Sequence, residues 1–392
     1  MPNKLTMLRR ITSDGRWLPE IDGLRFMAIT SVFLYHFTLE VINKSGHLIS
    51  IQSRYDLPLR FIMNGGRGVP LFFVISGFIL ARPFASHHLL STRPVDLGAY
   101  FMRRVTRLEP PYLLCLLLCT FATAVYYHPP FHELLPHMLA SAFYLHGIAY
   151  RQMSSINPVL WSLEIEIQFY LLVPLLAQIF RIKSKAARRI SLLAMIATAA
   201  ILQAVFIPSS PVRLTPFQLT ILAYLQYFLA GLLLADIYLV EGSLPYSRNR
   251  GWDVVSLAGW SSLFYIVQDS IWVQAILPFL IMLLYIAAFR GVAFRAFFRN
   301  QWIATIGGMC YTIYLVHSYS MAILFKRTRH LVVFHDLLAN LAVQLVIMLP
   351  IIAVVCLIFY TLIERPCMDP KWPRKLIAYL SGHRTALKPA AS

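Results

Sequence analysis

Residues 337–363 have the sequence LLANLAVQLVIMLPIIAVVCLIFYTLI, a run of 27 residues without one charged side chain. A helix needs about 20 consecutive, mostly apolar residues to cross the hydrocarbon core of a bilayer. This run is long enough and apolar enough to do so, and it therefore predicts a transmembrane helix. Toward the N-terminus the same pattern recurs.

Ten such runs can be traced in the 392 residues. They cover residues 24–42, 67–85, 109–128, 159–180, 190–208, 217–240, 253–270, 271–290, 302–325 and 337–363. Between 253 and 290, Gln268–Ser270 would have to form a very tight turn. Residues 131–148 are aromatic, contain histidines and include Pro136, which favours an interfacial or re-entrant segment.

The composition agrees with these runs. Hydrophobic residues make up 58% of the chain and charged residues 13%, whereas soluble globular proteins have roughly 45–50% and 25%. A soluble cytosolic enzyme, a disordered chain and a disulfide-rich secreted domain are therefore excluded. The net charge of +18 is spread over short clusters between the apolar runs. We predict an all-α, polytopic integral membrane protein with about ten transmembrane helices, in contact with the lipid bilayer and with no nucleic-acid partner.

The distribution of positive charge predicts the topology, because Lys and Arg accumulate in cytoplasmic loops. With ten spans, one set of loops together with both chain ends carries 25 Lys and Arg, and the opposite set carries nine. Both termini are therefore predicted to be cytoplasmic, in a multi-pass protein of the inner (plasma) membrane. Residues 1–20 and 367–392 would be cytoplasmic segments, and residues 21–366 the membrane domain.

The five cysteines form no C-x-x-C pair and have no ligand spacing with histidine, so we predict no structural disulfide and no metal site. The chain also lacks a Gly-rich phosphate loop, a G-x-S-x-G motif and a dinucleotide fingerprint. Because the templates of soluble enzymes do not apply, the function must be sought among the polar residues of the apolar runs.

Arg25 and His36 lie eleven residues apart in the first run. Eleven helical steps of about 100° end about 20° past three full turns, so the two side chains share one face, about 16 Å apart along the axis. Ionisable groups within a span are costly and commonly functional. The pair could bind an anionic cytosolic molecule at Arg25 and perform acid–base chemistry at His36. Alternatively, Arg25 extends to the interface and His36 is a hydrogen-bonded core residue.

Ser162, Glu166 and Tyr170 recur at every fourth position of the fourth run and form one polar stripe. Glu164 is about 200° away from Glu166 on a helix and faces elsewhere, together with Gln168. A carboxylate stripe that faces a histidine could orient a base. It could equally clamp two helices together.

Two further groups of residues precede or open a run. Arg104 and Arg107 share a face if their segment is helical, where they could bind phosphates or simply anchor the span. The block Gly65–Phe78 contains Ser76 and Gly77 in mid-span, which could bring the backbone close to a ligand or serve helix packing. His317, in the ninth run, is a further ionisable group predicted to be buried, with either a structural or a functional role.

Taken together, these segments resemble the membrane-bound acyltransferase family 3, whose members O-acylate carbohydrates and some lipids or antibiotics. The matching blocks follow the family order over about residues 18 to 366. They are Ile21-Asp22-Gly23-Leu24-Arg25 with His36, the Gly65–Phe78 block, Arg104-x-x-Arg107 with Pro110 and Tyr112, Trp161-Ser162-Leu163 with Glu166 and Phe169-Tyr170, Tyr311 to His317, and Glu364-Arg365-Pro366.

The chain departs from the family pattern at a few positions. Phe26 stands where glycine is frequent, Glu109 where an aromatic residue often precedes the proline, and Ile167 where a second acid or polar residue is common. Glu164 occupies a position that is usually small. These changes leave the catalytic set intact but could reshape the acceptor cleft. With 29 residues after Ile363, we expect no extracytoplasmic esterase-like domain such as some relatives carry.

The resemblance implies an acyl-CoA donor, most often acetyl-CoA, used from the cytoplasm. Arg104 and Arg107, with Arg25, would bind its phosphates, and Ser76-Gly77 would line the thioester channel. The predicted catalytic residues are His36, Glu166 and Arg25. His36 would act as general base or carry the acyl group, and Glu166 would orient His36 or the acceptor hydroxyl. The substrate or structural candidates are Trp161, Ser162, Tyr170 and His317.

The predicted function is therefore O-acetylation of a cell-envelope or exported carbohydrate or glycoside, as in polysaccharide biosynthesis. A proton-coupled transporter that uses His36 and Glu166 as a relay is the alternative. The sequence contains no internal repeat that favours a transporter. It leaves open the acceptor, the acyl chain, a covalent acyl-enzyme and the oligomeric state.

Overall fold

A computed structural model describes residues 8–11, 17–44, 57–207, 214–241, 249–266, 271–332, 334, 336–373 and 375. Within these residues the chain forms helices, turns and loops and no strand. The prediction of an all-α membrane protein is confirmed. The tight turn predicted at Gln268–Ser270 lies outside the described residues.

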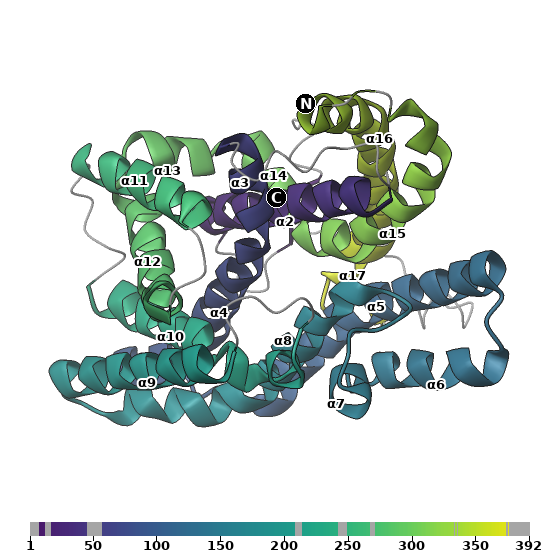
Figure 1. Ribbon diagram of the computed structural model, residues 1–392. Coiled ribbons are helices and arrows are strands. Elements are labelled where there is room, and N and C mark those ends of the chain that lie inside the picture. The colour runs from purple at the N-terminus through teal and green to yellow at the C-terminus, as the bar shows by residue number, and fades with distance from the viewer. Residues whose placement is uncertain are drawn as a thin grey trace, which may run out of the picture.

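The longer helices alternate with short helical turns (Figure 1). The α-helices are α2 (Pro19–Lys44), α3 (Leu57–Met63), α4 (Gly68–Leu90), α5 (Leu97–Tyr127), α6 (Phe131–Ala142), α7 (His146–Tyr150), α8 (Trp161–Leu176), α9 (Lys185–Phe206), α10 (Leu225–Val240), α11 (Gly251–Tyr265), α12 (Ile271–Arg290), α13 (Ala293–Phe298), α14 (Gln301–Gly308), α15 (Cys310–Thr328), α16 (Leu337–Phe359) and α17 (Arg365–Cys367). Short 3-10 turns are η3 (Asn64–Arg67), η4 (Pro158–Leu160), η5 (Ala177–Arg181), η6 (Pro216–Leu219), η7 (Ile221–Ala223) and η8 (Arg329–Leu331), and η9 (Tyr360–Glu364) is a π-helical turn.

Seven helical segments of the described chain are long and apolar enough to cross a membrane. They are Pro19–Lys44, Leu57–Leu90, Leu97–Tyr127, Pro158–Arg181, Lys185–Phe206, Trp272–Arg290 and Leu337–Cys367. An eighth span would combine α14 with Cys310–Leu331, which are bent by 68°. The remaining two predicted spans correspond to α10 and α11, which have only 16 and 15 residues. A total of ten spans stays a prediction.

Local signals explain where these helices begin. Pro19 opens α2, where its fixed φ suits the first turn, and Glu20 and Asp22 follow at the positive end of the helix dipole. Asp96 caps α5 by accepting from the Ala99 amide at 3.2 Å. Ser184 and Asp336 cap α9 and α16 in the same way. Each cap satisfies an amide that has no partner within its helix.

Helix α2 lies at the centre, between two groups of helices (Figure 1). On one side it packs on α4, which in turn packs on α10, and the largest hydrophobic core lies there. On the other side it packs on α15, which contacts α16, around a second core. A third core joins α5 and α6 to α8 and α15. The N-terminal half of α2 therefore packs in the first core and its C-terminal half in the second.

Helices α4 and α10 cross closely at Gly77 and Gly231. A Cβ atom at Gly231 would lie 2.5 Å from the Val74 carbonyl oxygen and 2.5 Å from the Phe78 nitrogen. A Cβ atom at Gly77 would collide with the Phe228 carbonyl oxygen. Only glycine permits two helix backbones to approach so closely. The crossing fixes the rotation of α4 and therefore the direction in which Ser76 points.

Candidate active site

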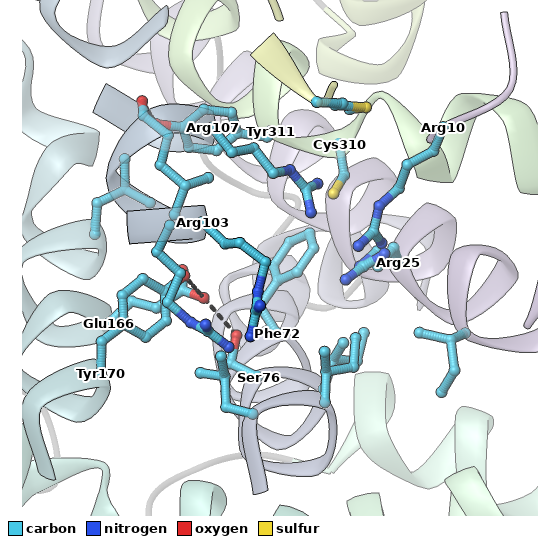
Figure 2. A pocket seen from close by; sticks show the side chains of 18 of the residues that line it. Arg10, Arg25, Phe72, Ser76, Arg103, Arg107, Glu166, Tyr170, Cys310 and Tyr311 are labelled. Atoms are coloured by element: carbon cyan, nitrogen blue, oxygen red, sulfur yellow. Dashed lines mark hydrogen bonds between the residues drawn. The ribbon is translucent and has the colours of Figure 1, made fainter. Parts of the chain in front are cut away.

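A cavity of about 730 Å³ opens among α2, α4, α5, α8 and α15 (Figure 2). Nine of its lining residues belong to α4, from Val69 to Pro83. At 1.5 Å per residue these fourteen steps cover about 21 Å along the helix. The part of the cavity that we call its mouth is also lined by residues near the two ends of the chain, namely Arg10, Ile11, Trp17, Leu18, Cys367, Met368 and Pro370. The cavity is therefore long, and it is built by segments far apart in the sequence.

The described lining is strongly basic. It contains six arginines, namely Arg10, Arg25, Arg82, Arg103, Arg104 and Arg107. Its acidic residues are Asp22 and Glu166 alone. Positive charges gathered in a cleft with low-dielectric walls concentrate anions there. The arrangement therefore favours an anionic ligand that enters at the arginine-rich end.

Asp22 organises one side of the mouth. Its carboxylate accepts from Arg25 Nη1 at 2.6 Å and from Trp17 Nε1 at 2.8 Å, and it lies 3.5 Å from Arg10 Nη1. Arg9 covers the Trp17 ring, with its guanidinium carbon 3.3 Å from the ring centroid. Sequence reasoning quoted Asp22 only as part of a motif and missed Arg10 and Trp17. The i, i+3 spacing of Asp22 and Arg25 was the signal available.

The opposite side of the mouth carries cations with few protein partners. Residues 97–127 are helical, so Arg104 and Arg107 share a face of α5 as predicted. Arg104 donates to the Tyr100 carbonyl at 2.6 Å and lies over the Tyr100 ring. Within the described chain, Arg107 and Arg103 form no hydrogen bond and no ion pair. These guanidinium groups are therefore available to an anionic ligand.

Glu166 lies farther along the cavity and is held by two hydroxyl groups (Figure 2). Its Oε1 atom accepts from Ser76 Oγ at 2.5 Å and from Tyr170 OH at 2.8 Å. Ser76 belongs to α4, whereas Glu166 and Tyr170 lie one turn apart on α8. Ser162, Glu166 and Tyr170 all line the cavity, as the predicted polar stripe requires. The stripe therefore lies inside the cavity and also ties α8 to α4.

A second pair of hydroxyl groups lines the cavity, and one of the two lies on α8 one turn before Glu166. Ser162 Oγ lies 2.6 Å from Tyr314 OH, and Tyr314 donates to the Val159 carbonyl oxygen at 2.5 Å. A carbonyl oxygen can only accept, so the Tyr314 proton points to Val159 and Ser162 donates to Tyr314. Tyr314 was missed as a site residue, although it lies three residues before His317.

His36 and His317 pair with each other and do not line this cavity. His36 Nδ1 lies 2.9 Å from His317 Nε2, and the ring centroids are 5.1 Å apart. His317 is fully buried and His36 is half-buried. The His317 ring lies 5.8 Å from that of Tyr314, which borders the cavity. The structure thus brings His36 to His317 and gives Glu166 the partners Ser76 and Tyr170.

Two other predicted residues face away from the cavity. Gly77 packs against α10, and the Trp161 ring lies tilted beside that of Tyr224, with ring centroids 5.5 Å apart. Neither residue is among those that line the cavity. Their proposed contact with a ligand stays a prediction.

The acids at unusual positions have structural partners. Glu164 accepts from the Gly147 amide at 2.7 Å and so attaches α7 to α8. Gln168, on the same face, accepts from the Ile221 amide at 3.0 Å. Glu109 accepts from Tyr144 OH at 3.2 Å, and burial, followed by the Glu109 charge, raises the pKa of the Tyr144 hydroxyl. Tyr144 lines the cavity. Glu109, which stands where the family often has an aromatic residue, therefore contacts a side chain of the cavity wall.

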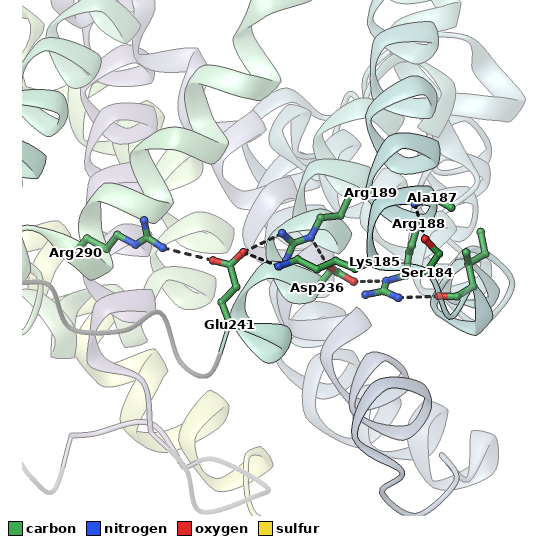
Figure 3. A network of polar contacts seen from close by, with 9 residues as sticks. Ser184, Lys185, Ala187, Arg188, Arg189, Asp236, Glu241 and Arg290 are labelled. Carbon is green, nitrogen blue, oxygen red and sulfur yellow. Dashed lines mark hydrogen bonds and ion pairs between the residues drawn. The ribbon is translucent and has the colours of Figure 1, made fainter.

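A second group of cations, outside the cavity, is held in ion pairs (Figure 3). Asp236 is completely buried at the end of α10 and binds Arg188 and Arg189 of α9. Glu241 binds Arg189 at 2.9 Å, and this hydrogen bond lowers the pKa of Glu241. Asp236 therefore serves as a buried clamp between α9 and α10. In the described chain, no three His, Cys, Asp or Glu side chains are placed to hold a metal ion.

Comparison with known proteins decides the family. Residues 18–362 match the family defined by an acyltransferase domain, which is most of the chain. The chain belongs to this acyltransferase family. The prediction that the chain is a member of this family is therefore confirmed.

The chain is also similar to curated proteins that are named as O-acetyltransferases or putative O-acetyltransferases. O-acetyltransferase OatA of Staphylococcus aureus (strain NCTC 8325 / PS 47) is 28% identical over 330 residues, which cover 77% of this chain and 50% of the relative. A putative O-acetyltransferase, SACOL0978, of S. aureus strain COL is 27% identical over 170 residues, or 41% of this chain and 25% of that protein. The chain thus aligns with about half the length of OatA and about a quarter of the length of SACOL0978. No solved structure matches the chain significantly.

Proposed function

We propose that this acyltransferase moves an acetyl group from acetyl-CoA, or another acyl group from its CoA thioester, to a hydroxyl of a cell-envelope or exported carbohydrate. The observation that carries the proposal is the basic cavity, with six arginines against two acids along a path of about 21 Å. Such a cavity suits a long, thin donor with a polyanionic end. The inner (plasma) membrane is the proposed site of action.

The residues of the mouth fit a phosphorylated donor. Guanidinium groups bind phosphate oxygens through paired, charge-assisted hydrogen bonds. Arg107 and Arg103 have no protein partner in the described chain, and Arg104 bonds one backbone carbonyl. Arg104 and Arg107 would hold the phosphates, with Arg25 on the opposite side of the mouth. When bound, the donor supplies an activated acyl group as a thioester.

His36 is the proposed base for the acceptor hydroxyl. An alcohol is a poor nucleophile at neutral pH, and a positioned imidazole removes its proton as the new bond forms. The names of the two relatives, an O-acetyltransferase and a putative O-acetyltransferase, support oxygen as the acceptor atom. A cytosolic donor and an acceptor on the outer face could meet at such a site within the membrane.

The transporter alternative receives no support from the geometry. A proton relay through His36 and Glu166 requires the two groups to communicate. In the described chain, His36 bonds His317 and Glu166 bonds Ser76 and Tyr170.

The test uses cells with and without the protein and the purified protein in lipid nanodiscs. Envelope glycans of the deletion strain, isolated and analysed by mass spectrometry, should lack a base-labile acyl ester that the parent strain carries. When these glycans are incubated with radiolabelled acetyl-CoA and the purified protein, they should regain the ester. His36→Ala should lower this transfer about a hundredfold or more, to a residual rate that the radiolabel still detects, while its melting temperature and elution profile stay unchanged. Glycans that are identical in both strains, or full activity in His36→Ala, would contradict the proposal.

A further inference from the structure

The protonation of His317 follows from its surroundings. Its Nδ1 atom lies 2.9 Å from the Ile313 carbonyl oxygen and 2.8 Å from the Tyr314 carbonyl oxygen. Carbonyl oxygens only accept hydrogen bonds, so Nδ1 of His317 carries a proton. Ile313, Tyr314 and His317 lie on consecutive turns of α15, which makes this arrangement a property of the helix.

The second nitrogen of His317 must then be an acceptor. His317 is completely buried beside the rings of Phe33 and Tyr314, at centroid distances of 6.2 and 5.8 Å. An imidazolium at this position would be a buried charge with only backbone carbonyls as partners, which is costly. The neutral ring has its lone pair on Nε2. His36 Nδ1, at 2.9 Å, must therefore be the donor of the bond between the two rings.

From these bonds we infer that His317 is a positioning residue, which fixes His36 in the tautomer with the proton on Nδ1 and the lone pair on Nε2. This inference rests on the proposed function, in which His36 is the base. In the described chain, no protein group bonds Nε2 of His36, so this atom is free to face the acceptor hydroxyl. A histidine that is free to exchange tautomers would spend part of its time with Nε2 blocked by a proton.

The proton balance assigns the reacting atom. Nε2 of His36 takes the hydroxyl proton as the acceptor oxygen bonds to the acyl carbon, and it holds this proton for the thiolate that leaves. Meanwhile the Nδ1 proton of His36 stays in the hydrogen bond to His317, and this hydrogen bond becomes charge-assisted. The proton cannot travel farther, because the other nitrogen of His317 is protonated and faces two carbonyl oxygens. The histidine pair therefore orients one base and does not conduct protons.

Two amide variants separate orientation from structure. The side-chain amide of glutamine reaches the place of Nε2, so His317→Gln can still accept from His36. The amide of asparagine reaches only the place of Nδ1, so His317→Asn can keep the bonds to the carbonyls of Ile313 and Tyr314 but loses the acceptor. A purely structural role would favour asparagine or treat both alike.

The measurement is acetyl transfer to the deletion-strain glycans with radiolabelled acetyl-CoA, by each variant in nanodiscs. We expect His317→Gln to keep kcat within about tenfold of the parent and His317→Asn to lose about a hundredfold or more, with the KM for acetyl-CoA unchanged in both. Equal activities, or a more active asparagine variant, would overturn the inference.

If the glutamine variant fails to fold, a double-mutant cycle can still test the inference. In the background of His36→Ala, a residue that acts only through His36 has nothing left to orient, so adding His317→Asn should cost no further activity. A further loss at unchanged melting temperature would contradict the positioning role. Absence of transfer by the parent protein would instead refute the proposed function, so the two failures are distinguishable.

Discussion

At the scale of single residues, two arginines that the sequence alone does not distinguish have different roles. Arg188 is buried and bound to Asp236, so its charge is neutralised within the protein. Arg107 lines the cavity without an ion pair or hydrogen bond in the described chain. Both lie in segments that sequence analysis assigns to the cytoplasmic side, and only their partners distinguish an anchor from a ligand-binding residue.

Replacement of these two arginines should therefore affect different quantities. Arg107→Gln removes a cation that we propose to contact a donor phosphate, an interaction worth about 1.5–3 kcal/mol. We expect the KM for acetyl-CoA to rise roughly 10- to 100-fold while the melting temperature stays within about a degree of the parent. Steady-state kinetics at fixed acceptor and a thermal melt measure both quantities.

Arg188→Gln is the matched control. It leaves Asp236 as a buried acid with one partner fewer, and the breakage of a buried pair commonly costs about 3–5 kcal/mol. The melting temperature should fall, whereas the KM of the remaining folded protein should not change. An Arg107 variant that loses stability and keeps its KM would assign that residue to structure instead.

The sequence allowed several of these residues to be predicted, but not their partners. Helical periodicity placed Arg104 with Arg107 and Ser162 with Glu166 and Tyr170, because such neighbours are local. The pairing of His36 with His317 joins residues 281 positions apart and depends on the packing of α15 against α2. Long-range contacts of this kind leave no periodic signal in a single sequence.

At the scale of elements, the main differences from expectation concern broken helices. Residues 302–325 predict one span, whereas the chain bends by 68° between α14 and α15. Gly307 lies so close to the Asp22 carbonyl oxygen of α2 that no side chain would fit. The carboxylate of Glu364 accepts from Thr312 N at 3.1 Å in the first turn of α15 and so stabilises its new N-terminus. A hydropathy profile measures only the length of an apolar run. It does not report the close contact at Gly307 or the hydrogen bond from Thr312 to Glu364, which together explain the bend.

The glycine crossing of α4 and α10 gives a test at this scale. Gly231→Ala places a methyl group 2.5 Å from backbone atoms of α4, which cannot move aside cheaply. Overpacking of this kind typically costs about 1–3 kcal/mol, so the melting temperature should fall by several degrees. Thermal unfolding in detergent, followed by intrinsic fluorescence, measures the change.

Gly66→Ala is the matched control for that variant. Its new Cβ atom would meet nothing closer than the Tyr35 ring at 3.7 Å, an ordinary contact. We expect little change in stability there. If Gly231→Ala were as stable as Gly66→Ala, the close crossing of α4 and α10 would be refuted, together with the account of how Ser76 is oriented.

At the scale of the whole molecule, charge distribution and cavity agree on which side the donor enters. The side predicted to be cytoplasmic carries 25 Lys and Arg against nine on the other. Arg10, Arg82, Arg103, Arg104 and Arg107 all belong to that richer set, and all five line the cavity. These five arginines are among the 25 residues counted, and the cavity adds where their side chains lie in space.

This agreement predicts a sidedness that sealed vesicles can test. Inside-out vesicles expose the cytoplasmic face, so added radiolabelled acetyl-CoA, which does not cross a bilayer, should transfer its acetyl group there. Right-side-out vesicles should be inactive until they are opened by a mild detergent, after which both preparations should reach the same rate. Arg107→Gln should weaken the response to acetyl-CoA in opened and inside-out vesicles equally, because it changes the cavity and not the orientation. Transfer by intact right-side-out vesicles alone would place the arginine-rich mouth on the outer face and overturn the topology that the loop charges predict.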